Sequence, residues 1–379
     1  MKKIYLDNAA TTPLAPEVLE VMMPFLKEDF GNPSSTHSFG RKTKNIIEIT
    51  RRNIANHLNA DPNEIIFTSG GTEADNMALR CAVTDLGVKR IITSPIEHHA
   101  VGHTADHLKE IMNIEVDLVK IKEDGHIDLD HLETLLQKDT STLVSLMHAN
   151  NEIGNLLPIK KVSDLCRKHN AYFHSDTVQT MGHYAFDVKE LDIDFLTCAA
   201  HKLHGPKGVG FLFIKNNIQI NQFITGGSQE RKHRGGTENL YGIVGLGKAL
   251  DLAFQDLESH QNHVQELKSY MINELLTIDD QIKFNGDIQP EHSLYTVLNV
   301  CFPKNEQNSM LLFSLDIKGI AASGGSACSS GSNTGSHVLA ELPHSNECQS
   351  IRFSFSRYTT KKEIDFALEK IKELVALSV

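Results

Sequence analysis

Five polar residues follow apolar, strand-like runs along the first half of the chain. They are Thr72, His98, Asn151, Asp176 and Lys202. In an open α/β sheet the carboxyl ends of parallel strands meet along one edge, and ligands bind there. We therefore expect these residues, although far apart in the sequence, to line one pocket.

A lysine and an aspartate in this set suggest carbonyl chemistry. Lys202 lies between the apolar run 194–197 and the turn Gly205-Pro206. Burial lowers the pKa of a lysine amine and leaves it free to form a Schiff base. Asp176 ends the run 171–174, and a buried carboxylate needs a cation such as the protonated pyridine nitrogen of pyridoxal phosphate. The alternatives are a solvated loop lysine and a helix-capping aspartate.

The turn Ser69-Gly70-Gly71-Thr72 connects a predicted strand to a predicted helix. Glycines let the backbone approach an anion, and the helix N-terminus directs free N–H groups and a positive dipole end at it. A phosphate site is one interpretation, and a tight turn with Thr72 as N-cap is the other. The pattern is neither a P-loop nor G-x-G-x-x-G, so a nucleotide is not favoured.

Adjacent histidines follow the next predicted strand, in Glu97-His98-His99. One imidazole could stack on a flat cofactor and move protons near neutral pH. Paired histidines could also indicate a metal, but no third and fourth ligand stand at typical spacing, so we expect no metal site.

The segment 323–336 contains thirteen small or polar residues and Cys328. Such a composition is typical of flexible chain, which would expose the thiol. The choice is between a functional thiol and a linker with an incidental cysteine.

Further along, Arg352 lies inside the apolar run 350–357, where a guanidinium requires an acid partner. A substrate carboxylate and a structural Asp or Glu both satisfy that requirement.

Strand and helix patterns alternate between residues 60 and 215, which predicts an α/β fold with a mostly parallel, doubly wound sheet. The predicted strands are 64–68, 90–93, 143–147, 171–174, 194–197 and 208–214, and the predicted helices are 72–83, 98–111 and 159–170. A long helical stretch over 242–275 then leads to a smaller α/β domain. We predict a large domain over 16–255 and a small domain formed by 1–15 and 256–379.

The composition excludes several classes of protein. The 379 residues carry 37 Lys and Arg against 48 Asp and Glu, a net charge of −11, which disfavours binding to nucleic acid or an anionic membrane. No run approaches the ~18 apolar residues of a membrane span, and no secretory signal is visible. We therefore expect a cytoplasmic protein whose six cysteines are reduced.

Taken in order, the motifs resemble those of the cysteine desulfurases, which belong to the fold type I, class V aminotransferase group of pyridoxal-phosphate enzymes. The resemblance covers nearly the whole chain and is carried by residues 5–13, 30–35, 67–73, 148–154, 201–202, 235–239, 325–329 and 351–354. Three positions depart from the family pattern: Ala199 replaces a phosphate-binding serine, Gly235 a common serine and Gly335 a frequent proline.

The resemblance implies pyridoxal 5′-phosphate as cofactor. Lys202 would bind it covalently, Asp176 would pair with its ring nitrogen, and Gln179 would bond its phenolic oxygen. His98 would stack on the ring and assist proton transfer. The implied phosphate ligands are Gly71, Thr72 and His201, with Thr237 from the other subunit of a homodimer.

The resemblance also implies the reaction. Arg352 and Asn151, which also contacts the cofactor, would bind the carboxylate of L-cysteine. Cys328 would take the substrate sulfur as a persulfide, and L-alanine would leave. The sulfur would pass to an acceptor such as an iron–sulfur scaffold or a tRNA-thiolation protein. Selenocysteine lyase, another Cβ-lyase, an aminotransferase and a non-catalytic sulfur-transfer scaffold are the competing interpretations.

Overall fold

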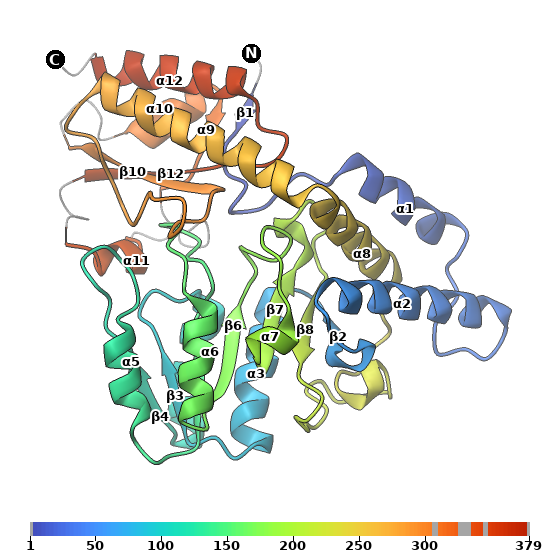
Figure 1. Ribbon diagram of the computed structural model, residues 1–379. Coiled ribbons are helices and arrows are strands. Elements are labelled where there is room, and N and C mark those ends of the chain that lie inside the picture. The colour runs from blue at the N-terminus through green and yellow to red at the C-terminus, as the bar shows by residue number, and fades with distance from the viewer. Residues whose placement is uncertain (1–2, 305–309, 325–334, 344–347, 377–379) are drawn as a thin grey trace.

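The computed structural model describes residues 3–304, 310–324, 335–343 and 348–376 (Figure 1). A seven-stranded sheet dominates the first 255 residues. Its order is β2 (Ile65–Thr68), β8 (Gly210–Ile214), β7 (Phe195–Ala199), β6 (Tyr172–Asp176), β5 (Thr142–Ser145), β3 (Arg90–Thr93) and β4 (Glu115–Leu118). Strands β3 to β7 are parallel, and β8 is antiparallel to both its neighbours. The predicted mostly parallel sheet is confirmed.

Both faces of this sheet are buried. Ile65 and Phe67 of β2 belong to one hydrophobic cluster, whereas Ile66 between them belongs to another. Because side chains alternate along a strand, the two clusters lie on opposite faces, as in a doubly wound fold. The helices of this region are α1 (Pro16–Lys27), α2 (Ser38–His57), α3 (Gly71–Asp85), α4 (His99–Met112), α5 (Leu129–Leu136), α6 (Ile159–Lys168), α7 (Val188–Leu191) and α8 (Leu240–Gln255).

One strand of the seven-stranded sheet, β4, is missing from the sequence prediction. Its side chains are exposed or half-buried, and Glu115 and Asp117 alternate with Val116 and Leu118. Such a polar edge strand lacks the continuous apolar run by which the buried strands are recognised.

The long helical stretch predicted over 242–275 consists of two helices, α8 and α9 (Leu257–Ile278), because Asp256 between them has a non-helical backbone (φ −129°, ψ 36°).

A third hydrophobic cluster holds the C-terminal region together. It contains a three-stranded antiparallel sheet in the order β12 (Cys348–Ser354), β10 (Val297–Pro303) and β9 (Lys283–Phe284). The N-terminal β1 (Ile4–Tyr5) pairs with β11 (Ile320–Ala321) and joins the same cluster. The remaining helices are α10 (Leu311–Ile317), α11 (His337–Ala340) and α12 (Lys361–Ala376). The domain boundaries at residues 15 and 255 stay a prediction, which this separate core supports.

The expectation of six reduced cysteines is wrong for two of them. Cys301 and Cys348 form a disulfide, with their Cα atoms 5.2 Å apart. They lie 47 residues apart in the sequence but on the neighbouring strands β10 and β12, a proximity that spacing alone does not reveal. Cys81, Cys166 and Cys198 are buried free thiols. Cys328 lies outside the described residues.

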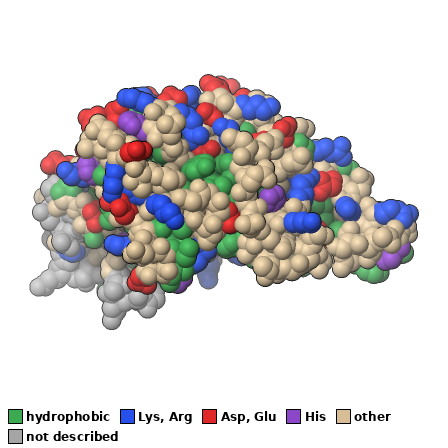
Figure 2. All heavy atoms as spheres, turned by 90° about the horizontal axis from the view of Figure 1, so that it is seen from below, with side chains coloured by type: hydrophobic (Ala, Val, Ile, Leu, Met, Phe, Trp, Pro, Cys, Tyr) green, Lys and Arg blue, Asp and Glu red, His purple; other side chains and the backbone are tan. Residues whose placement is uncertain are grey.

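Charges of both signs are interspersed over the face drawn in Figure 2, rather than gathered into a field of one sign. Within the described part of the chain, no helix is long and apolar enough to cross a membrane.

A buried ion pair ties helix α2 to the sheet. Arg51 donates from Nη1 and Nη2 to the two carboxylate oxygens of Glu230 at 2.7 and 2.8 Å, and from Nη1 to the Ile65 carbonyl at 2.6 Å. Glu230 also accepts from the Phe67 backbone N–H at 2.8 Å. Both side chains are at most 3% exposed, so each charge depends on the other.

We expect Glu230→Gln to lower the free energy of unfolding by about 3–5 kcal/mol, because the buried guanidinium loses its buried counter-charge and keeps only the partly exposed Glu48, 3.2 Å from its Nε. Urea unfolding followed by circular dichroism measures the change. The matched control is Asp29→Asn, which removes the carboxylate that Lys42 contacts at 2.6 Å at the surface and should cost at most about 1 kcal/mol. Equal losses in the two variants would show that the Arg51–Glu230 pair has no special role.

Candidate active site

A cavity of about 220 Å³ opens where the strands of the seven-stranded sheet end. Nine residues predicted for the site line it: Gly71, Thr72, His98, Asn151, Asp176, Gln179, His201, Lys202 and Arg352. Thr237 lies instead in a neighbouring cavity, beside Ser69 and Gly208. Cys328 is outside the described residues. The prediction that polar residues after successive strands converge in one pocket is therefore confirmed.

Asp176, at the end of β6, is a buried acid on the pocket wall. It is 6% exposed, and one carboxylate oxygen accepts from the Val178 backbone N–H at 2.8 Å. Burial, together with the nearby Asp75 carboxylate, raises the pKa of Asp176 to about 7. A cation placed against Asp176 would therefore be stabilised, and would in turn favour the ionised carboxylate.

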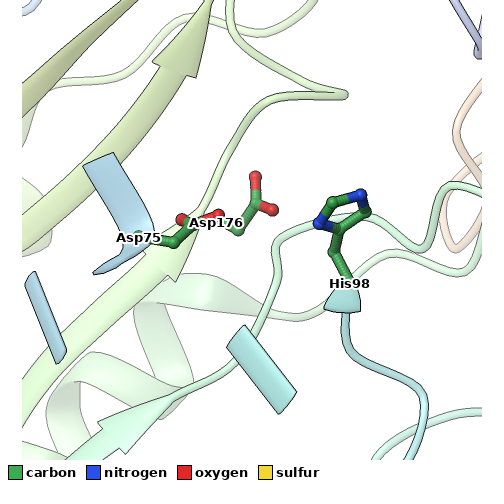
Figure 3. A group of neighbouring side chains, drawn as sticks. All are labelled: Asp75, His98 and Asp176. Atoms are coloured by element: carbon green, nitrogen blue, oxygen red, sulfur yellow. The ribbon is translucent and has the colours of Figure 1, made fainter. Parts of the chain in front are cut away.

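His98 caps the N-terminus of α4 and faces Asp176 (Figure 3). Its Nδ1 accepts from the Ala100 N–H at 3.1 Å, which leaves the proton of the neutral ring on Nε2. Burial, followed by the charge of Lys202, lowers the pKa of His98 to about 4. The ring is therefore neutral at pH 7.

The Gly-Gly turn is built as the phosphate interpretation requires. Gly70 is the N-cap of α3 and has φ +149°, a conformation that L side chains rarely adopt. A Cβ on Gly71 would lie 2.8 Å from the Val178 side chain, so the backbone must be bare there. Thr72 is not the N-cap but lies within the first turn of α3, where backbone N–H groups remain available to an anion.

Lys202 ends a short 3-10 helix, Ala200–Lys202, directly after β7. Its Nζ donates to the carbonyls of Ala9 and Ala10, at 2.5 and 2.9 Å. Gln179 donates to the same Ala9 carbonyl at 3.0 Å, so the N-terminal segment closes one side of the pocket.

His201, next to Lys202 in the chain, pairs with the Thr11 hydroxyl at 3.2 Å, and burial lowers the pKa of His201 to about 4. Ala199 lies on the pocket wall, where the family pattern has a hydroxyl.

Arg352 of β12 reaches the pocket from the C-terminal region. Its Nη2 forms an ion pair with Asp7 at 2.8 Å, and its Nη1 donates to the Asn151 carbonyl at 2.8 Å. A structural acid partner, one of the two possibilities in the sequence, is therefore present. Arg352 nevertheless lines the cavity, and its buried Nε has no hydrogen-bond partner among the described residues.

The cavity wall also holds residues to which sequence reasoning gave no role in the site, among them Asp75, Glu152, Val178 and His337. Asp75 lies one helical turn after Thr72, a spacing that could have placed it on the same face of α3. With His98 and Asp176 it forms a group whose ligand atoms all lie within 4.8 Å of one another. In the view of Figure 3 the Asp176 carboxyl lies between the other two side chains.

The Aminotransferase class-V family model matches residues 4–366. Among curated proteins, "Cysteine desulfurase IscS" of Dictyoglomus turgidum is 44% identical, over 99% of this chain and 95% of that protein. A protein of the same name from Methanosarcina thermophila is also 44% identical, over 99% of this chain and 92% of that protein.

Solved structures agree with these relatives. A "NIFS-LIKE PROTEIN" superposes with a TM-score of 0.91 at 35% identity, over 99% of this chain and all of that one. "SspA in complex with cysteine" has a TM-score of 0.79 at 32% identity, over 94% of this chain and all of that one. Family model, relatives and structures each span nearly the full length, and the chain belongs to the class V aminotransferase family.

Proposed function

We propose that this protein is a pyridoxal-phosphate-dependent cysteine desulfurase, which converts L-cysteine to L-alanine and takes the sulfur onto Cys328. The observation that carries the proposal is the single cavity that brings together Lys202, His98, Asp176 and Arg352. Full-length relatives named as cysteine desulfurases support the same reaction.

The described residues fit this cofactor. His98 and Val178 line the cavity and leave room for a flat ring, with the buried Asp176 carboxylate available to a ring cation. The bare backbone at Gly71, the start of α3 and His201 line an adjoining groove suited to a phosphate. Bound there, pyridoxal phosphate would withdraw electrons from the Cα of an amino acid joined to its aldehyde carbon.

The side chains then have distinct tasks. Lys202 would hold the cofactor through its amine, and that amine, once free, would take the Cα proton of the substrate. His98, neutral at pH 7, would stack on the ring and assist proton transfer. The guanidinium of Arg352 and the amide of Asn151 hold the substrate carboxylate. Gln179 bonds the phenolic oxygen.

The sulfur step balances without an outside oxidant. The Cys328 thiolate attacks the substrate sulfur, the S–S bond forms as the Cβ–S bond breaks, and that electron pair stays with the carbon fragment. Protons from the pocket complete L-alanine. The persulfide on Cys328 then carries a sulfur atom that an acceptor protein can take. We place the reaction in the cytoplasm.

We infer that two copies share each site. Thr237 lies in a cavity next to the phosphate groove rather than in it, as expected for a residue that serves a second copy. Large apolar side chains on and near α1 and α2 are exposed in the single chain: Leu19, Leu26, Phe30 and Phe39. A second copy covering this surface would remove them from water.

The sulfur route is tested by alanine release from L-cysteine, with pyridoxal phosphate and a thiol reductant. We expect Cys328→Ala and Lys202→Ala each to lower turnover at least about 100-fold, because each removes a group that makes or breaks a bond. Cys328→Ala should still bind the cofactor, as its absorption spectrum reports. Full turnover by Cys328→Ala would exclude the persulfide route while leaving the cofactor site intact.

Substrate binding is tested at Arg352. We expect Arg352→Lys to lower kcat/KM for L-cysteine about 10- to 150-fold, since a charged hydrogen-bonded contact contributes ~1.5–3 kcal/mol and an ammonium lacks the planar fork. The control, Asp7→Asn, removes the ion pair but keeps the guanidinium, so its KM should change far less. The same loss in both variants would mean that Arg352 acts only through its structural pair.

A further inference from the structure

A second buried carboxylate, Asp75 of α3, lies behind Asp176. It is 1% exposed and lines the same cavity. Its Oδ1 atom has no hydrogen-bond partner among the described residues. A hydrogen bond with the Thr197 side chain lowers the pKa of Asp75, but burial has the larger, opposite effect, so ionisation of this acid is costly unless a positive charge comes close to it.

The residue that packs against Asp75 does not supply this charge. His174 Nε2 lies 3.4 Å from Asp75 Oδ1 but only 3.1 Å from the Thr197 hydroxyl, and His174 Nδ1 pairs with Ser145 at 2.8 Å. Two hydroxyls thus satisfy both nitrogens of a neutral ring. Burial lowers the pKa of His174 to about 4, so the ring carries no charge at pH 7.

The charges around Asp75 are mostly negative. Asp176 of β6 has an oxygen within 4.8 Å, and the Asp75 carboxylate makes ionisation of Asp176 less favourable in the absence of a cation. Glu97, before α4, is a third buried acid, and burial raises its pKa to about 8. From the other side His98 is neutral, and Lys202 contributes the positive charge that acts on Asp176.

We propose that Asp75 is a second carboxylate of the cofactor site, a positioning residue that acts through Asp176 to hold a protonated ring nitrogen in place. The inference rests on the proposed function, because the cation it requires arrives with pyridoxal phosphate. Two stacked carboxylates give a stronger negative potential at the ring than one, in a region where water cannot screen it. Binding of the ring cation would then explain both why Oδ1 of Asp75 has no hydrogen-bond partner among the described residues and why several acids lie at this edge of the sheet.

The ionisation of Asp75 should make the affinity for pyridoxal phosphate depend on pH. Burial raises the pKa of Asp75 to about 7 in the protein without cofactor. Above that pH Asp75 is charged and attracts the ring cation, whereas well below it the carboxyl is neutral and resembles an asparagine amide. The advantage of Asp75 over asparagine should therefore be largest above pH 7 and should shrink as the pH falls.

The test is the dissociation constant for pyridoxal phosphate, measured by equilibrium dialysis between pH 6 and 8.5. We expect Asp75→Asn to weaken binding about tenfold at pH 8.5, a difference that converts to ~1.4 kcal/mol, and by much less at pH 6. The absorption spectrum of the bound cofactor should also titrate at a lower pH in the variant, because a negative charge near it is lost.

The matched control is Asp85→Asn, the same chemical change on the same helix. Its carboxylate bonds Asn221 away from the cavity, so binding should equal that of the wild type at every pH. If Asp75→Asn does not fold, as judged by circular dichroism, Asp75→Ser provides the second neutral variant, with the same expectation.

The outcomes separate the two proposals. Wild-type protein that does not bind pyridoxal phosphate would overturn the proposed function. Wild-type binding with an unchanged dissociation constant in the neutral variants would overturn only the role of Asp75. Weakening by the same factor at every pH, with an unshifted spectrum, would show a merely structural role and would also overturn it.

Discussion

The electrostatics of the site depend on one constraint: carboxylates are buried where the parallel strands end. Asp176 ends β6, and Asp75 approaches it from α3, so the pocket concentrates negative charge where water has little access. Neither acid has an arginine or lysine ion pair among the described residues, in contrast to Glu230 with Arg51. The negative charge of the site thus has no ion pair with an arginine or lysine among the described residues, whereas the charge of Glu230 is balanced by Arg51. Such an unbalanced negative charge favours the binding of a cationic ring.

The C-terminal region completes the pocket through the chain ends. Arg352 of β12 pairs with Asp7, beside β1, and with the backbone of Asn151, which follows β5. Lys202 and Gln179 meet the carbonyl of Ala9 in the same N-terminal segment. Residues from both hydrophobic regions of the chain therefore converge on the short N-terminal stretch from Asp7 to Ala10.

The sequence predicts the site better where a residue follows a strand than where it lies inside a helix. His98, Asp176 and Lys202 stand after apolar runs, and parallel strands bring such positions together by topology alone. Asp75 is reached by helical periodicity, a signal that marks many charged residues on ordinary exposed faces. The partners of Cys301 and Arg352 depend on strand pairing between segments that are distant in the chain, which no local pattern specifies.

Burial shifts the pKa values of the histidines and of the acids around the pocket in opposite directions. Burial lowers the pKa of His98, His174 and His201 to about 4, so these rings stay neutral through the physiological range and pair with a backbone N–H or with hydroxyl groups. Burial instead raises the pKa of Asp75 to about 7, and burial together with the nearby Asp75 carboxylate raises the pKa of Asp176 to about 7. Between pH 6 and 8, therefore, the carboxylates rather than the histidines change the charge of this edge of the sheet, and a cation bound there couples its affinity to their ionisation.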